Sequence, residues 1–121
     1  MTVRVFCYAR CGTCKKALKW LADRGVAHTV IPITEKPPSL RLLRTLHQRS
    51  GLDIKRFFNT SGGSYREGNW SKKLKTVSVE EALEALAADP MLIKRPLVDG
   101  GELALVGFKE AEWQDAFSLA S

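Results

Sequence analysis

Residues 6–26 read FCYARCGTCKKALKWLADRGV, and they hold all three cysteines of the chain before running into a helical pattern. Apolar side chains recur there every three or four positions, which is typical of a helix with one buried face. Gly25 follows at the place where a glycine commonly ends a helix. The stretch therefore predicts a helix whose apolar stripe consists of Cys14, Ala17, Leu18 and Leu21.

Strand patterns lie on both sides of this predicted helix. Residues 3–7 alternate in polarity and are rich in β-branched side chains, and residues 28–33, HTVIPI, form a second such run. Pro32 indicates a strand at the sheet edge, or the end of that strand. A strand, a helix and a strand in this order predict parallel strands joined by a right-handed crossover.

Residues 36–92 carry mainly helical signals. Ser39 can cap one helix, and Ser78 with Glu81 forms a capping box ahead of a second apolar run. The polar, glycine-rich residues 59–73, NTSGGSYREGNWSKK, predict a loop or a short irregular helix. We therefore expect a helical insert over approximately residues 36–92.

Strand signals return after the insert. Residues 96–98 and 102–106 predict two strands joined by Asp99-Gly100-Gly101, a sequence typical of hairpin turns. The expected order is therefore β, α, β, helical insert, β, β, α within one α/β domain over residues 1–121. The last helix of that order is indicated by the helical spacing of Trp113, Ala116, Phe117 and Ala120.

Composition points to a soluble protein with an uneven charge. No apolar run approaches the roughly 18 residues that cross a bilayer, and the N-terminus lacks a secretory pattern, so we expect a cytoplasmic protein without a membrane segment. Residues 36–76 hold ten Lys and Arg against two Asp and Glu, whereas residues 77–121 hold three against nine. The basic middle is compatible with nucleic acid, an acidic protein surface or an anionic substrate, and equally with a solvated face.

Three cysteines within eight positions raise the question of a metal site. Cys7-x-x-x-Cys11-x-x-Cys14 matches the cysteine signature of radical SAM enzymes, but those enzymes form α/β barrels of about 200 residues or more. A structural zinc site needs four ligands, and His28 and His47 stand at no suitable spacing. We therefore expect no metal.

The segment Cys11-Gly12-Thr13-Cys14 stands at a strand-to-helix junction. The unpaired N–H groups of a first helical turn favour a thiolate, which makes Cys11 the expected nucleophile. Cys14 is one turn further on and can attack a mixed disulfide on Cys11. The alternative is that both are small apolar residues at a helix start. Cys7, on the inward face of a strand, is expected to be a packed core residue.

Three motifs carry a family resemblance. C-x-x-C-K-K-A-x-x-W-L at 11–21, IKRPLV at 93–98 and LVGFKE at 105–110 together resemble the arsenate reductase/Spx family over essentially the whole chain. The resemblance implies a thioredoxin-like, mixed four-stranded sheet with a helical insert between the βαβ and ββα halves. Among the branches of the family, the second cysteine places the chain nearer the C-x-x-C branch than the glutaredoxin-linked arsenate reductases.

The resemblance also implies a site around Cys11. It places the Arg95-Pro96 bond beside this cysteine, with Pro96 in the cis form, and gives Gly12, Thr13 and Pro96 a role in positioning the substrate. Arg95 would bind an oxyanion or the thiolate. The alternative for Arg95 is a surface salt bridge with the acidic C-terminal third.

The first functional hypothesis is a thiol-disulfide oxidoreductase. Cys11 would attack a disulfide or thiol-adduct substrate, and Cys14 would resolve the resulting mixed disulfide. We expect no bound cofactor, a low-molecular-weight thiol, thioredoxin or glutaredoxin as reductant, and a monomeric protein.

Two alternatives follow from other branches of the family. Spx-type regulators use a C-x-x-C switch and bind the RNA polymerase α subunit, and no motif here predicts direct sequence-specific binding of nucleic acid. Glutaredoxin-linked arsenate reductases hold their oxyanion with three arginines, and the matching positions here are Asn59, Arg95 and Gly107. Because only Arg95 is kept, arsenate reduction is the weaker alternative.

Overall fold

Four strands form one mixed sheet in the spatial order β2-β1-β3-β4. The computed structural model describes residues 2–120, with side chains described up to Ser118. β1 (Thr2–Cys7) pairs in parallel with β2 (Ala27–Pro32). β3 (Leu97–Asp99) pairs antiparallel with both β1 and β4 (Ala104–Val106). The predicted α/β fold with a mixed four-stranded sheet is therefore confirmed.

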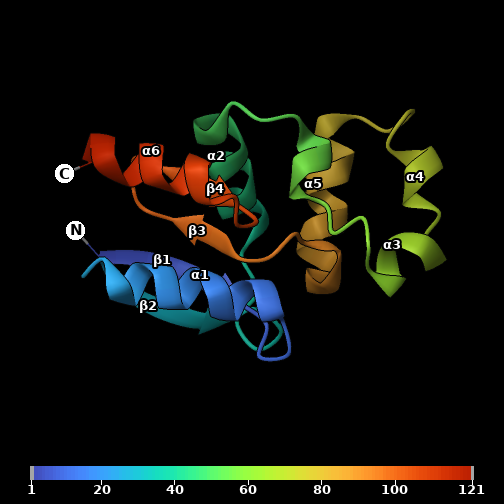
Figure 1. Cartoon of the computed structure of the whole chain (residues 1–121). Helices are drawn as coiled ribbons and strands as arrows, with labels where there is room; N and C mark the ends of the chain where they lie inside the picture. The colour runs from blue at the N-terminus through green and yellow to red at the C-terminus, as the bar shows by residue number, and fades with distance from the viewer. Residues whose placement is uncertain (1, 121) are drawn as a thin grey trace.

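Helices connect and cover this sheet. α1 links the two parallel strands β1 and β2, which confirms the predicted strand–helix–strand unit (Figure 1). The elements between β2 and β3 are helical, as predicted, and they extend away from the end of the molecule where both termini lie (Figure 1). The helical elements are α1 (Gly12–Asp23), α2 (Leu40–Ser50), η1 (Ile54–Phe57), α3 (Gly63–Glu67), α4 (Trp70–Lys73), α5 (Val79–Ala88), η2 (Pro90–Leu92) and α6 (Glu110–Ala120).

The side chains of β1 alternate between two apolar layers, one on each face of the sheet. Val3, Val5 and Cys7 belong to the layer that lies against α1 and α6. Phe6 belongs to the opposite layer, which is built with α2 and α5. Burying a large apolar side chain contributes about 1.5–3 kcal/mol. The sheet is therefore stabilised on both faces, and its cysteine-bearing face is the one toward α1.

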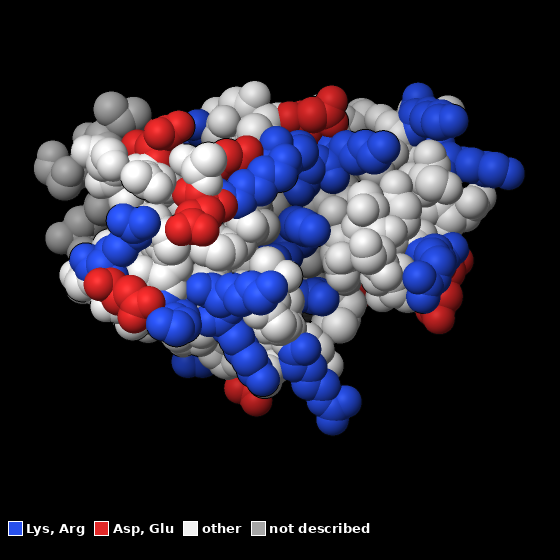
Figure 2. Space-filling model, viewed as in Figure 1, with Lys and Arg blue, Asp and Glu red and all other residues white. Residues whose placement is uncertain are grey.

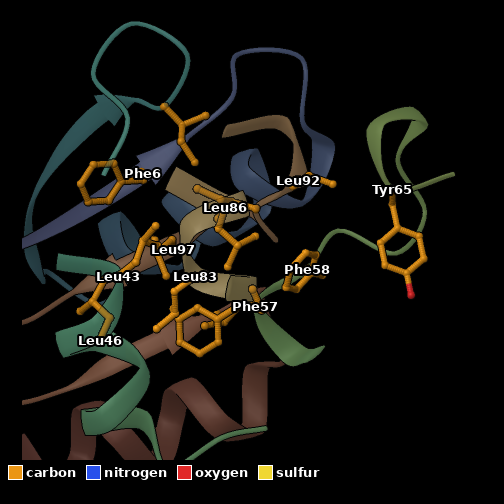
Figure 3. Close-up of a cluster of buried hydrophobic side chains, with 14 residues drawn as sticks. Phe6, Leu43, Leu46, Phe57, Phe58, Tyr65, Leu83, Leu86, Leu92 and Leu97 are labelled. Atoms are coloured by element: carbon orange, nitrogen blue, oxygen red, sulfur yellow. The ribbon is translucent and has the colours of Figure 1, made fainter. Parts of the chain in front are cut away.

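The layer beneath α2 and α5 contains most of the large buried side chains. Figure 3 shows Phe6 in one group with leucines of α2 and α5, whereas Tyr65 of α3 lies apart from that group. Phe57, which ends η1, is fully buried in the same layer. The helical insert is thus part of the core on this face of the sheet. The leucines concerned are Leu43, Leu46, Leu83 and Leu86.

The predicted helix caps are present. The Ser39 hydroxyl accepts the Leu42 N–H at 3.1 Å at the start of α2. Ser78 and Glu81 form a reciprocal capping box at α5, with both hydrogen bonds 3.1 Å long. Such caps satisfy N–H groups that the first helical turn leaves unpaired, and losing one costs about 1 kcal/mol.

The β3–β4 hairpin differs from its prediction. Its strands span 97–99 and 104–106, and not 96–98 and 102–106. Asp99 is the last residue of β3 and lies opposite Ala104, so it belongs to the strand and not to the turn. Its carboxylate accepts the Gly101 N–H at 3.1 Å and is bound by two arginines, which hold it in the sheet.

Other boundaries shift by a single residue. β2 runs from Ala27 to Pro32 and not over 28–33, and it is an edge strand that ends at Pro32, as both interpretations of that proline predicted. The polar stretch 59–73 forms the short helices α3 and α4.

Residues 1 and 121 of the predicted domain and the Ala120 side chain lie outside the described part. No helix in residues 2–120 has the length and apolar character to span a membrane.

Candidate functional site

Cys11 caps the N-terminus of α1. Its backbone is extended, and its Sγ accepts the backbone N–H of Cys14 at 3.4 Å. The Cys11 N–H in turn donates to the Tyr8 carbonyl at 3.0 Å, which closes the loop between β1 and α1. The half-exposed sulfur therefore lies at the positive end of a helix of 12 residues, where negative charge is stabilised.

Cys14 lies behind Cys11 on the buried side of α1. Only 2% of the Cys14 surface and 6% of the Cys7 surface are exposed. The prediction that Cys7 is a core residue is therefore confirmed. The neighbouring Cys7 thiol and burial together raise the pKa of Cys14 well above its ordinary value. The interaction with Cys14 lowers the pKa of Cys7, against the opposing effect of burial. All three cysteines are free thiols in the structure.

Gly12 and Thr13 form the exposed first turn of α1 beside Cys11. Apart from its chain neighbours and the backbone of its own helix, no atom lies within 4 Å of the position that a Gly12 Cβ would take, so the approach to this turn is open. Thr13 also lines a cavity that extends to β4. The structure thus places Gly12 and Thr13, two of the three predicted substrate-positioning residues, in the exposed turn beside Cys11.

The Arg95-Pro96 peptide bond is cis, as the resemblance implied. The Arg95 guanidinium lies 5.2 Å from the Tyr8 ring centroid, and its Nη1 donates to the Met91 carbonyl at 3.4 Å. Among residues 2–118, Arg95 forms no ion pair, so the alternative of a surface salt bridge is wrong for the described side chains. Arg95 reaches the cysteine loop through Tyr8, and its role toward an oxyanion or thiolate stays a prediction.

A basic groove lies next to the first turn of α1. A cavity of about 420 Å³ and an adjoining one of about 260 Å³ share three lining residues, Arg56, Lys94 and Lys109. Lys55 lines the larger cavity and Thr13 the smaller one. Figure 2 shows Lys and Arg side chains gathered across the middle of the face in view. We call this feature the basic groove and define its cations as Lys55, Arg56, Lys94 and Lys109.

The groove carries surplus positive charge. Arg56 is paired with Glu112, at 3.2 Å between Nη2 and Oε1. Within the described side chains, no carboxylate lies within ion-pair distance of Lys55, Lys94 or Lys109. Asp53 also lines the larger cavity, so an anion bound in the groove would meet these three lysines against one carboxylate, which leaves the charge positive.

Two features of the site were missed at the level of sequence. The groove cations come from η1, from the segment before β3 and from the segment before α6, so no local run of sequence predicts them together. The interaction of Cys7 with Cys14 was also not predicted, although the alternation of β1 placed Cys7 on the correct face. In the described part of the chain, no group of three or more His, Cys, Asp or Glu side chains is arranged to hold a metal ion.

Comparisons of sequence and of structure with known proteins both find the same family. The ArsC family profile matches residues 6–116. The uncharacterized protein YusI of Bacillus subtilis is 50% identical over 115 residues, which cover 95% of this chain and 98% of YusI. An arsenate reductase of Rhizobium meliloti is 31% identical over 101 residues, covering 81% of this chain and 69% of that protein. The crystal structure of an ArsC family related protein from Bacteroides fragilis matches with a TM-score of 0.91 at 41% identity, over 95% of this chain and 97% of that one.

Proposed function

Because the chain belongs to the ArsC family, we propose that it is a thiol-disulfide oxidoreductase whose working residues are Cys11 and Cys14. The observation that carries the proposal is the position of Cys11, half-exposed at the start of α1, with its sulfur accepting the Cys14 N–H. A cysteine at a helix N-terminus is the common form of a nucleophilic thiol. We expect this chemistry to take place in the reducing cytoplasm.

The two cysteines divide the reaction between them. The Cys11 thiolate attacks one sulfur of a disulfide substrate, forms a mixed disulfide and releases the other half as a thiolate. Cys14 then loses its proton and attacks the Cys11 sulfur, which forms the Cys11–Cys14 disulfide and releases the second thiolate. Its raised pKa keeps Cys14 protonated at neutral pH, so Cys11 acts first. A low-molecular-weight thiol, glutaredoxin or thioredoxin would return the pair to dithiols.

The basic groove supports an anionic thiol adduct as substrate. Its surplus cations begin beside Thr13, two residues from the attacking sulfur. Glutathione and bacillithiol carry carboxylates, so an adduct of either would place its reacting sulfur at Cys11 and its carboxylates toward Lys94 and Lys109. Charge–charge attraction of this kind raises both affinity and association rate at low salt.

Two cysteine variants test the proposal. In wild type we expect fast alkylation at neutral pH, and turnover of a glutathione mixed disulfide with glutathione or glutaredoxin as reductant. Cys11→Ser removes the fast alkylation and the turnover, whereas Cys14→Ser accumulates a mixed disulfide on Cys11 that mass spectrometry detects. Turnover that survives in Cys11→Ser would refute the proposal.

Arsenate reduction is the second candidate, favoured by the similarity to the arsenate reductase of Rhizobium meliloti. The arginine position at 107 is a glycine here, and a Cβ at Gly107 would stand 3.2 Å from the Lys94 side chain. Lys94 therefore covers the space beside this position and supplies a cation in its place. Restored arsenate tolerance in a sensitive host would support this candidate over the disulfide substrate.

Binding to the RNA polymerase α subunit stays a prediction from the family resemblance. A regulator would hold its Cys11–Cys14 disulfide and bind the subunit only in one redox state. A pull-down with purified α subunit under oxidising and reducing conditions tests it, and redox-dependent binding without turnover would favour the regulator.

A further inference from the structure

Three thiols converge at one end of the layer between the sheet and α1. Cys7 is the last residue of β1, and Cys14 stands in the first turn of α1. The loop between them is closed by the hydrogen bond from Cys11 to Tyr8, so the end of the strand and the start of the helix are held together. Cys7 and Cys14 belong to the same buried apolar cluster, and Cys11 packs against its edge.

Cys14 is the middle member of this group. Its side chain packs with Cys7 in the buried cluster, and its backbone N–H donates to the Cys11 sulfur at 3.4 Å. If Cys14 only filled space in the apolar layer, an aliphatic side chain in place of Cys7 would pack against it equally well. Two thiols buried in one cluster, at the adjoining ends of β1 and α1, are instead placed where a disulfide between them can form.

We propose that Cys7 and Cys14 form a second, buried redox site that receives the disulfide first made between Cys11 and Cys14. The inference rests on the proposed function, because its starting state is the Cys11–Cys14 disulfide. In the step, Cys7 loses its proton to solvent and its sulfur attacks the Cys14 sulfur. The Cys7–Cys14 bond forms, the Cys14–Cys11 bond breaks, and its electron pair leaves on Cys11 as a thiolate.

The exchange needs no external oxidant or reductant. One disulfide and one thiol are present before and after it, and only their positions change. The direction is favoured by solvation, because the negative charge ends on the half-exposed Cys11 at the start of α1, and an uncharged disulfide occupies the apolar layer. The departing thiolate is thus the one that lies at the start of a helix and nearer to solvent.

The consequence is an oxidised protein that again presents a reactive Cys11. In this state the disulfide joins Cys7 and Cys14, which are both buried. A protein reductant can therefore reduce it only after the reverse exchange has returned the disulfide to Cys11 and Cys14. Cys11 can meanwhile form a mixed disulfide that Cys14 is not free to resolve. The protein would therefore hold a thiol adduct on Cys11 for as long as the buried disulfide persists.

The sequence offers a direct assay. Trypsin cuts after Arg4, Arg10 and Lys15, which places Cys7 in peptide 5–10 and the other two cysteines in peptide 11–15. Reduced protein is oxidised with one equivalent of diamide, incubated, quenched in acid at intervals, alkylated, digested and mapped by mass spectrometry. A Cys11–Cys14 disulfide stays within peptide 11–15, whereas a Cys7–Cys14 disulfide joins the two peptides and leaves Cys11 alkylated.

In wild type we expect the internal disulfide first and then its replacement by the joined peptides, with Cys11 alkylation recovering at the same rate. Cys7→Ala stops at the internal disulfide. Val5→Ala, which also shortens an inward side chain of β1 but keeps Cys7, is the matched control and still shows the exchange. Circular dichroism melting of each variant verifies its fold, and the wild-type measurement stands without any variant.

The outcomes separate the two proposals. An internal disulfide that persists unchanged in wild type would overturn the buried site and leave the proposed function intact. Joined peptides in which fragmentation shows a Cys7–Cys11 bond would overturn it as well. If neither wild type nor Cys7→Ala ever forms the disulfide within peptide 11–15, the proposed function itself fails.

Discussion

Replacing Asp99 by asparagine is expected to destabilise the sheet by an amount that the structure allows to be worked out. The Asp99 carboxylate is 8% exposed and is bound by Arg4 of β1, by Arg49 of α2 at 3.3 Å and by the Gly101 N–H at 3.1 Å. It therefore ties three segments of the chain to the end of β3. Asparagine keeps the shape of the side chain and loses the charge.

The expected loss is about 2 kcal/mol at pH 7. Hydrogen bonds to charged groups contribute about 1.5–3 kcal/mol. The lower part of that range applies, because the Arg4 side chain is 50% exposed and that of Arg49 36%, so both regain solvation when the carboxylate charge is lost. Urea unfolding followed by circular dichroism measures the difference. Asp23→Asn, which removes the carboxylate of the exposed Lys19–Asp23 pair, is the matched control and should leave stability unchanged.

The effect has a defined pH dependence. Burial opposes ionisation of Asp99 and is the largest single influence, but the Arg4, Gly101 and Arg49 interactions together lower its pKa below the ordinary value. A lowered pKa contributes stability above the unfolded-state pKa of about 3.9, and this contribution is lost as the pH falls through the folded-state value. The gap between wild type and Asp99→Asn should therefore close below about pH 4. A gap of the same size at pH 3 and pH 7 would refute the reasoning.

Three further substitutions test the groove and the segment beside it. Lys94→Met and Lys109→Met should each lower kcat/KM for a glutathione mixed disulfide about threefold at low salt, and less at high salt, because each removes one exposed charge contact. Lys72→Met on α4 keeps the groove intact and should leave the rate unchanged, so an equal loss in this variant would contradict a specific groove. Trp113→Phe should cost about 1–3 kcal/mol in urea unfolding, because the buried indole N–H donates to the Gly107 carbonyl at 3.0 Å. An unchanged unfolding midpoint would show that this hydrogen bond contributes nothing net.

Local signals were sufficient for the helical and parallel parts of the fold. Ser78 and Glu81 are three residues apart, and their capping box forms as the spacing predicts. The position of Cys11 at the start of α1 follows in the same way from the junction of one strand pattern with one helical pattern. Interactions of this kind depend on neighbours in sequence, so the sequence displays both partners at once.

The parts that were missed depend on partners distant in sequence. Asp99 was assigned to a turn because aspartate before two glycines is typical of one, whereas the arginines that hold it in β3 come from β1 and α2. The groove cations likewise belong to three separate segments. The contact of Arg95 with Tyr8 also joins residues that are distant in sequence, so no local pattern predicts it.

The helices α3 and α4 stand at the far end of the molecule from both termini, and neither has a side-chain hydrogen bond at its N-terminal cap (Figure 1). Aromatic stacking joins this arm to the body, chiefly through Phe58 against Trp70 with 5.2 Å between ring centroids. The reacting thiols are built from β1 and α1 alone. A change in the length or surface of this arm would therefore leave the two elements that carry the cysteines unaltered.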